Sequence, residues 1–122
     1  MKVAVVAIGG ALGAAARYGV AILVARFWAG AFPLATFLIN VSGSFILGFF
    51  ATFAVEKSTL DPLWRLLVAT GFVGAYTTFS TFEYETQALT ETGATMIAVA
   101  NIAASVIAGF AAVQLGVILA RR

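Results

Sequence analysis

Four hydroxyl side chains lie around two phenylalanines in the segment GAYTTFSTFEYE, residues 74–85, within a stretch that is otherwise apolar enough to cross a membrane. Phe79 and Phe82 are three residues apart, so their rings share one face wherever the segment is helical. The rim of a phenyl ring is positively polarised, and each hydroxyl has a hydrogen to donate. The hydroxyls belong to Thr77, Thr78, Ser80 and Thr81.

This set of neutral, positively polarised groups suits a small anion that must lose its water and still be released. A lysine or arginine at the same place would bind the anion and hold it, whereas fast conduction needs moderate, repeated binding. Helix packing by the rings, with hydroxyls bonded back to their own helix, explains the same residues equally well. The segment therefore indicates an anion path, with helix packing as the alternative.

Two further polar side chains interrupt apolar stretches. Asn40 lies near the centre of the second stretch, where a buried amide needs a partner. An interhelical hydrogen bond worth roughly 0.6–2 kcal/mol would supply one, but beside the hydroxyl segment we favour an N–H donor aimed into the path. Arg17 lies deep in the first stretch, where a guanidinium costs from about 2.5 to more than 10 kcal/mol at mid-bilayer. It either snorkels and anchors its helix or reaches an aqueous vestibule or an anion.

Gly71 and Gly74 precede the hydroxyls and weaken the helix locally. A broken helix is tolerated at membrane depth only where its freed carbonyls and amides find protein, water or an ion. Exposed carbonyls bind hard cations such as sodium, and exposed N–H groups bind anions. We therefore expect the third span to be broken near its centre.

The remaining polar residues of the spans are less informative. Glu83 and Glu85 follow the hydroxyl segment toward the end of the third span, where surface charges are the favoured interpretation. Asn101 and Ser105 are four residues apart on the fourth span, so they either extend a polar track along one face or hydrogen-bond between helices.

The composition places all these residues in a membrane. Of the 122 residues, 62% are hydrophobic and 10% charged, and the mean hydropathy is +1.05. Charged and turn-forming residues, among them Glu56, Lys57, Ser58 and Asp61, divide the chain into four apolar stretches of at least the ~20 residues that a span requires. The stretches cover roughly residues 3–28, 33–55, 62–89 and 95–120. We predict an all-α membrane protein with one four-helix domain over residues 1–122.

Several function classes are disfavoured. The chain contains no cysteine and no histidine, so neither a disulfide framework, a thiolate metal site nor a histidine proton shuttle is available. No convergent nucleophile, base or metal set points to an enzyme. The net charge of +2 is read as a mark of topology rather than as a nucleic-acid footprint.

Three sequence blocks together resemble the Fluc family of fluoride channels, also called CrcB. They are GGALGAAARY (9–18), TFLINVSGSFILGF (36–49) and GFVGAYTTFSTF (71–82), in the family's order. The resemblance implies a passive exporter of toxic fluoride in a bacterial-type inner membrane. It further implies an antiparallel, dual-topology dimer with two pores and a structural sodium ion at its centre.

The same resemblance implies roles for individual residues. Phe79 and Phe82 would line the fluoride path with their ring edges, and Asn40 would be the pore amide. Arg17 would lie near the vestibule. Ser80, Thr81 and, by a looser match, Ser105 would belong to the polar lining, and the carbonyls of Gly74 and Thr77 would hold the sodium ion.

The chain departs from the family pattern at three positions, Val73, Ala75 and Tyr76, where Cys, Gly and Phe are common. The uneven distribution of its basic residues also disagrees with a homodimer that inserts in both orientations. If the termini and the second loop share one side, that side has five basic residues against two, whereas a homodimer that inserts both ways favours no bias. A heterodimer with a paralogue is therefore an alternative. The five are Lys2, Lys57, Arg65, Arg121 and Arg122, and the two are Arg17 and Arg26.

Two other functions compete with the channel. A proton-coupled small multidrug transporter also has four spans and forms dimers, but it needs a membrane-embedded carboxylate, and no acidic residue lies near the centre of any span here. A non-transporting assembly subunit would explain the many small residues but not the polar segment.

Overall fold

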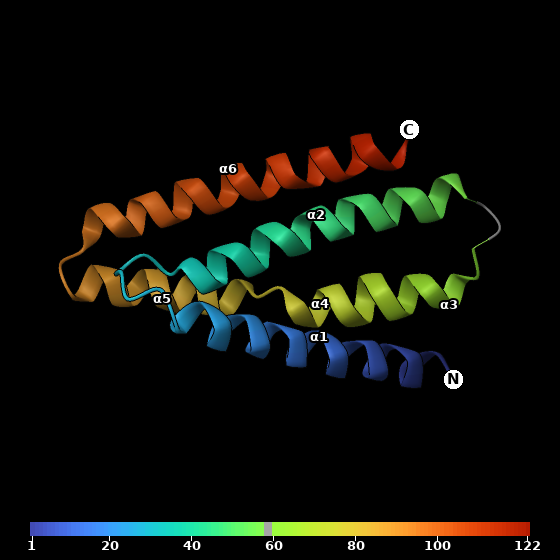
Figure 1. The fold of residues 1–122 in the computed structure, drawn as a ribbon, viewed down its shortest axis with the longest axis horizontal. Coiled ribbons are helices and arrows are strands. Elements are labelled where there is room, and N and C mark those ends of the chain that lie inside the picture. Colours follow the sequence, from blue (N-terminus) through green and yellow to red (C-terminus); the bar gives the residue numbers. More distant parts are fainter. Residues whose placement is uncertain (58–59) are drawn as a thin grey trace.

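The computed structural model describes residues 1–57 and 60–122, and every regular element in that part of the chain is a helix (Figure 1). The chain runs four times along the molecule. Both termini lie at the same end as the close of α2 and the start of α3, and the other two connections lie at the opposite end (Figure 1). Ser58, which the sequence analysis places between the second and third apolar stretches, lies outside the described residues.

Three helices are long and apolar enough to cross a membrane. They are α1 (Lys2–Ala25), α2 (Leu34–Glu56) and α6 (Thr95–Ala120). The first ends three residues before the predicted limit of Trp28, because the chain turns there toward α2. The indole of Trp28 stabilises this turn by donating a hydrogen bond of 2.8 Å to the carbonyl of Phe32.

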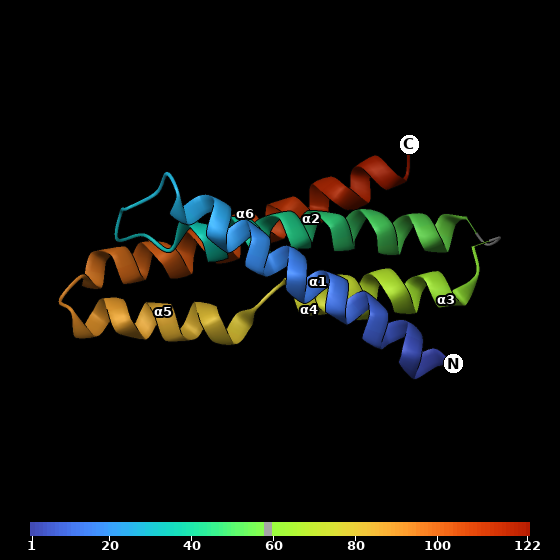
Figure 2. The same ribbon diagram turned by 60° about the horizontal axis from the view of Figure 1, so that its bottom comes forward.

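The third apolar stretch runs beside α2 in two helical halves that an extended segment joins and offsets from each other (Figures 1 and 2). The prediction of a span broken near its centre is thus confirmed, and the chain is a multi-pass membrane protein. The first half contains α3 (Pro62–Arg65), the π-helix η1 (Leu66–Val73) and α4 (Gly74–Tyr76), and the second half is α5 (Phe79–Glu91).

Local sequence explains where the third stretch begins. Asp61 is the N-cap of α3 and accepts a hydrogen bond of 2.8 Å from the backbone N–H of Leu63. Pro62 occupies the first turn, where its missing N–H costs nothing. Arg65 then donates from Nη2 to the carbonyl of Ala54 at 2.7 Å, which ties α3 to the C-terminal end of α2.

The π-helix packs against α1 through glycines on both sides. A Cβ added at Gly9 or Gly13 would overlap the carbonyl of Leu67 or Phe72, and one at Gly71 would lie 2.7 Å from the carbonyl of Val6. Gly9 and Gly13, which form a G-x-x-x-G pair, therefore serve close backbone packing. Hydropathy does not reveal the π-helix, because its composition is that of any apolar helix.

A second small-residue contact joins α2 to α6. Cβ atoms added at Gly48 and Gly116 would overlap the carbonyl of Val113 and approach the carbonyl of Phe45 to 2.5 Å. With no apolar driving force between helices inside lipid, such close approach is what holds spans together. The two glycine contacts place α1 and α6 on opposite sides of the broken stretch and α2.

We predict that Gly13→Ala lowers the free energy of unfolding by about 1–3 kcal/mol, the usual cost of overpacking, because its methyl group would overlap the Phe72 carbonyl. The midpoint of thermal unfolding in detergent, followed by tryptophan fluorescence, measures the effect. Gly19→Ala is the matched control, since a Cβ there meets nothing within 4 Å. Equal midpoints for the two variants would contradict the packing described for α1.

Candidate functional site

The break in the third stretch consists of two extended residues. Thr77 has φ −76° and ψ 157°, and Thr78 has φ −149° and ψ 115°. The break therefore lies just beyond Gly71 and Gly74, the residues that the sequence analysis expected to weaken the helix. Gly74 itself is helical, with φ −60° and ψ −34°, and Gly71 lies inside η1. Gly71 serves close packing against α1, and the helix opens at the threonines.

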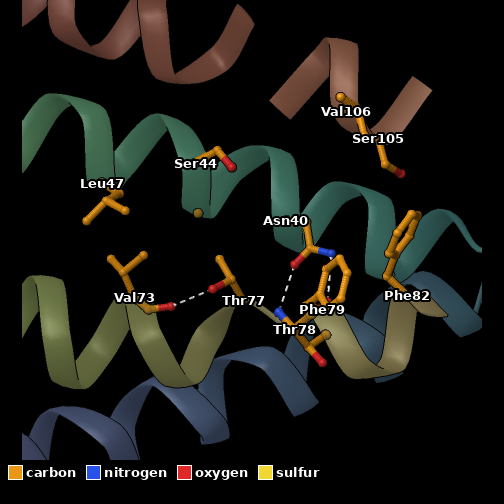
Figure 3. A pocket seen from close by; sticks show the side chains of 11 residues that line it. Asn40, Ser44, Leu47, Val73, Thr77, Thr78, Phe79, Phe82, Ser105 and Val106 are labelled. Atoms are coloured by element: carbon orange, nitrogen blue, oxygen red, sulfur yellow. Dashed lines mark hydrogen bonds between the residues drawn. The ribbon is translucent and has the colours of Figure 1, made fainter. Parts of the chain in front are cut away.

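Asn40 of α2 holds the break open with two hydrogen bonds to Thr78 (Figure 3). Its Nδ2 donates to the carbonyl of Thr78 at 2.9 Å, and its Oδ1 accepts from the N–H of Thr78 at 2.8 Å. In an uninterrupted helix that N–H would donate to the carbonyl of Gly74. Thr78 is only 7% exposed, so its backbone groups need hydrogen-bond partners within the protein. Asn40 supplies the partners that the break requires and keeps a second Nδ2 hydrogen for another acceptor.

The hydroxyls of the break bond mainly within their own segment. Thr77 Oγ1 donates back to the carbonyl of Val73 at 3.0 Å. Thr78 Oγ1 caps α5 by accepting from the N–H of Thr81 at 3.2 Å, and it donates to Thr81 Oγ1 at 2.9 Å. Back-bonding, the alternative stated in the sequence analysis, thus accounts for Thr77, and N-capping of α5 accounts for Thr78. Ser80 is exposed and lies in neither of the two pockets described below.

A pocket of about 290 Å³ lies beside the break and gathers four of the predicted pore residues from three helices (Figure 3). The rings of Phe79 and Phe82 line it with their centroids 5.9 Å apart and their planes at 44°. Phe82 is 7% exposed and Phe79 is 73% exposed, so a single chain covers only one of the two rings. Asn40 and Ser105 are the other two, and Thr77, predicted as a sodium ligand, lines the pocket as well.

The pocket also contains residues that the sequence analysis missed. Ser44 lies one helical turn after Asn40 on α2, and this i, i+4 spacing was a usable signal. Thr78 was recognised as a hydroxyl of the segment but not as a lining residue. Apart from these polar groups and Thr77 the wall is apolar, and none of the described residues that line the pocket is charged.

A second pocket, of about 340 Å³, lies on the α1 side of the break and contains Arg17, Thr81 and Glu85. Arg17 Nη1 lies 3.5 Å from the carbonyl of Thr77, at the limit of a hydrogen bond. Thr78 lines both pockets and, among the residues that the structure describes, is the only one that they share. The break therefore separates a charged chamber from a neutral one.

The structure corrects the expectation that Glu85 is a surface charge. Its Oε1 accepts a hydrogen bond of 2.9 Å from Thr36 Oγ1, and its Oε2 is buried without a partner among the described residues. Thr36 is itself only 6% exposed. Glu83, by contrast, is exposed as expected. No local pattern indicates the Glu85 contact, because Thr36 lies 49 residues away.

Comparison with known proteins gives consistent matches over almost the whole chain. The family model described as "CrcB-like protein, Camphor Resistance (CrcB)" matches residues 4–117. A protein of Solibacter usitatus named "Fluoride-specific ion channel FluC" is 43% identical over 122 residues, all of both chains. Its namesake from Acidobacterium capsulatum is 46% identical over 100% of this chain and 98% of its own. "Fluoride-specific ion channel FluC 2" of Symbiobacterium thermophilum is 44% identical over 96% of this chain and 95% of its own.

We predict that Asn40→Leu destabilises the protein by about 1–3 kcal/mol for each backbone group of Thr78 left unpaired. It should also speed hydrogen exchange at the Thr78 amide, because the mutation removes both partners of that residue. Thermal unfolding in detergent and exchange mass spectrometry of residues 74–85 measure the two effects. Ser42→Ala is the control on the same helix, since among the described residues its hydroxyl hydrogen-bonds to Ile39 and Tyr76 and not to the break. Unchanged exchange in Asn40→Leu would show that the break does not depend on Asn40.

Proposed function

Because the chain belongs to the CrcB family, we propose that it is a fluoride-selective ion channel that lets toxic fluoride leave the cell passively across the inner membrane. The observation that carries the proposal is the neutral pocket at the break. Asn40 and the rings of Phe79 and Phe82 meet there, and no described residue in the wall is charged. The family is one of channels, so no catalytic reaction is involved.

The chemistry of the pocket fits a small anion. Asn40 has one Nδ2 hydrogen left after its bond to Thr78, Ser105 contributes a hydroxyl, and the phenyl rims are positively polarised. Together these dipoles replace part of the ion's water. None of them is a full charge, so the ion is not held as it would be by a lysine or arginine.

The charged pocket on the other side of the break suits the entrance of the path. The positive charge of Arg17 raises the local concentration of anions in a low-dielectric setting. An ion that moves from there to the neutral pocket must pass Thr78, which lines both. In this proposal Thr81 belongs to the entrance, and Ser80 lines the path only where a second subunit covers it.

A second copy of the chain would complete the site. Phe79 is 73% exposed, and a ring that guides an ion needs cover on its open side. We infer an antiparallel, dual-topology dimer with two pores, one for each broken stretch. The basic-residue bias and the numeral in the name FluC 2 of one relative keep a heterodimer with a paralogue as the alternative.

The break also provides carbonyl oxygens that suit a structural sodium ion. The N–H that would pair with the Gly74 carbonyl donates to Asn40 instead, and Thr77 is extended, so both carbonyls are free of the helical ladder. Hard cations prefer carbonyl oxygens as ligands, and an unwound helix exposes them within a membrane. One chain offers two carbonyls and a symmetric pair offers four, so the ion would join the subunits.

Glu85 is the one observation that favours a different mechanism. It is a half-buried carboxylate in the entrance pocket, and proton-coupled carriers need such a group. The family assignment makes the small multidrug transporter the weaker alternative. Proton-coupled fluoride transport is distinguished from a channel by whether a pH gradient drives the flux.

We predict that liposomes containing only the purified chain release fluoride rapidly and retain chloride. The release should be driven by the fluoride gradient and the membrane potential, with no dependence on a pH gradient. Ion-selective electrodes measure both anions directly. Fluoride retention by liposomes that hold folded protein would contradict the proposal or, if a paralogue restores release, establish the heterodimer.

The pocket assignment is tested by one substitution at two positions. Phe82→Ile should reduce the fluoride rate at least tenfold, because the aliphatic chain has no polarised rim. Phe110→Ile is the matched control, since Phe110 is 65% exposed on α6 and lines neither pocket. Equal rates in the two variants would place the path elsewhere.

The sodium proposal predicts that protein purified and reconstituted in potassium without sodium shows reduced fluoride flux, and that added sodium restores it. The reason is that the ion would link carbonyls of two subunits at the breaks. Flux and the dimer fraction, measured by crosslinking in the two media, are expected to change together. Identical values in both media would remove sodium from the account.

A further inference from the structure

A fully buried amide connects α6 to α5 beside the neutral pocket. Asn101 is 1% exposed, although it belongs to an apolar helix most of whose neighbouring side chains are exposed. Its Nδ2 donates to Thr86 Oγ1 of α5 at 2.9 Å, and its Oδ1 accepts from Ser105 Oγ at 3.3 Å. Thr86 Oγ1 in turn donates to the carbonyl of Phe82 at 2.7 Å.

The three donations run in one direction, from Ser105 through Asn101 and Thr86 to the backbone of Phe82. Ser105 begins this series of hydrogen bonds and Phe82 ends it, and both residues line the neutral pocket. While the Ser105 hydrogen is given to Asn101, only the lone pairs of that hydroxyl remain for the pocket. An anion that uses Ser105 as a donor must take the hydrogen from Asn101.

The length of the Ser105–Asn101 bond makes this exchange easy. At 3.3 Å it exceeds the 2.7–2.8 Å that is common for a hydroxyl donor, so it is a weak bond. It still gives the hydroxyl an acceptor when no ion is near, and a buried hydroxyl without one is costly. Ser105 therefore has two possible acceptors, the fixed Oδ1 of Asn101 and the mobile anion.

We propose that Asn101 is a positioning residue that competes with the permeating anion for the Ser105 hydroxyl and thereby speeds release of the ion. The inference rests on the proposed fluoride conduction. Every fluoride ion that binds displaces the Asn101 acceptor, and every ion that leaves is replaced by it. Asn101 thus weakens binding in the pocket without touching the ion, as rapid conduction through a binding site requires.

Asn101→Leu tests this role, because leucine has a similar shape and offers no acceptor. In planar bilayers the fluoride concentration at half-maximal current is expected to fall about three- to tenfold, the range that one neutral hydrogen bond allows. The maximal current per channel should fall as well, because release becomes slower. A merely structural role would reduce the number of active channels and leave the half-maximal concentration unchanged.

Two further variants make the result specific. Gln114→Leu removes a carboxamide from an exposed position of the same helix and should leave both quantities at the wild-type values. In a Ser105→Ala background, Asn101→Leu should no longer shift the half-maximal concentration, since its effect passes through the hydroxyl. Asn101→Ala removes the same acceptor and makes the test if the leucine variant does not fold, as judged by gel filtration.

The outcomes separate the two proposals. Wild-type protein that carries no fluoride current contradicts the proposed function itself. Wild-type current with an unshifted half-maximal concentration in Asn101→Leu contradicts the role of Asn101 alone. A shift that persists without the Ser105 hydroxyl contradicts it too, because the amide would then act through helix packing.

Discussion

The double hydrogen bond between the side chain of Asn40 and the backbone of Thr78 is the interaction on which the site depends. Inside a bilayer every backbone N–H and C=O must have a partner, so a span can open only where another group takes the place of the helical bond. Asn40 provides both partners from the neighbouring helix. It therefore allows the third span to stop and restart within two residues, and the restart points Phe79 and Phe82 at one pocket.

The rest of the fold keeps the break in place. Glycines on α1 and in η1 bring their backbones together, and glycines on α2 and α6 do the same on the other side. These contacts fix the first half of the broken span against α1, where Arg17 reaches the carbonyl of Thr77. They also hold α2 and α6 close, so that Asn40 and Ser105 line a common pocket. Packing by small residues thus determines which polar groups meet.

Hydropathy and charge were sufficient to predict four helical passes, because these follow from local composition, and the broken third span was predicted from Gly71 and Gly74. The position of the break was less accessible. Gly71 looked like a point of weakness, but its missing side chain serves contact with α1, and the helix opens at Thr78 because Asn40 lies opposite. That pairing joins residues 38 apart and depends on how α2 packs. The bond from Thr36 to Glu85 was missed for the same reason.

The central claim is that neutral dipoles at the break replace the water of a small anion within the membrane. A crystal structure of the chain grown with fluoride tests it most directly. The account predicts an ion in the pocket within hydrogen-bonding distance of Asn40 Nδ2 and beside the rim of Phe82. Rings sealed in apolar packing, with neither ion nor solvent next to them, would contradict it.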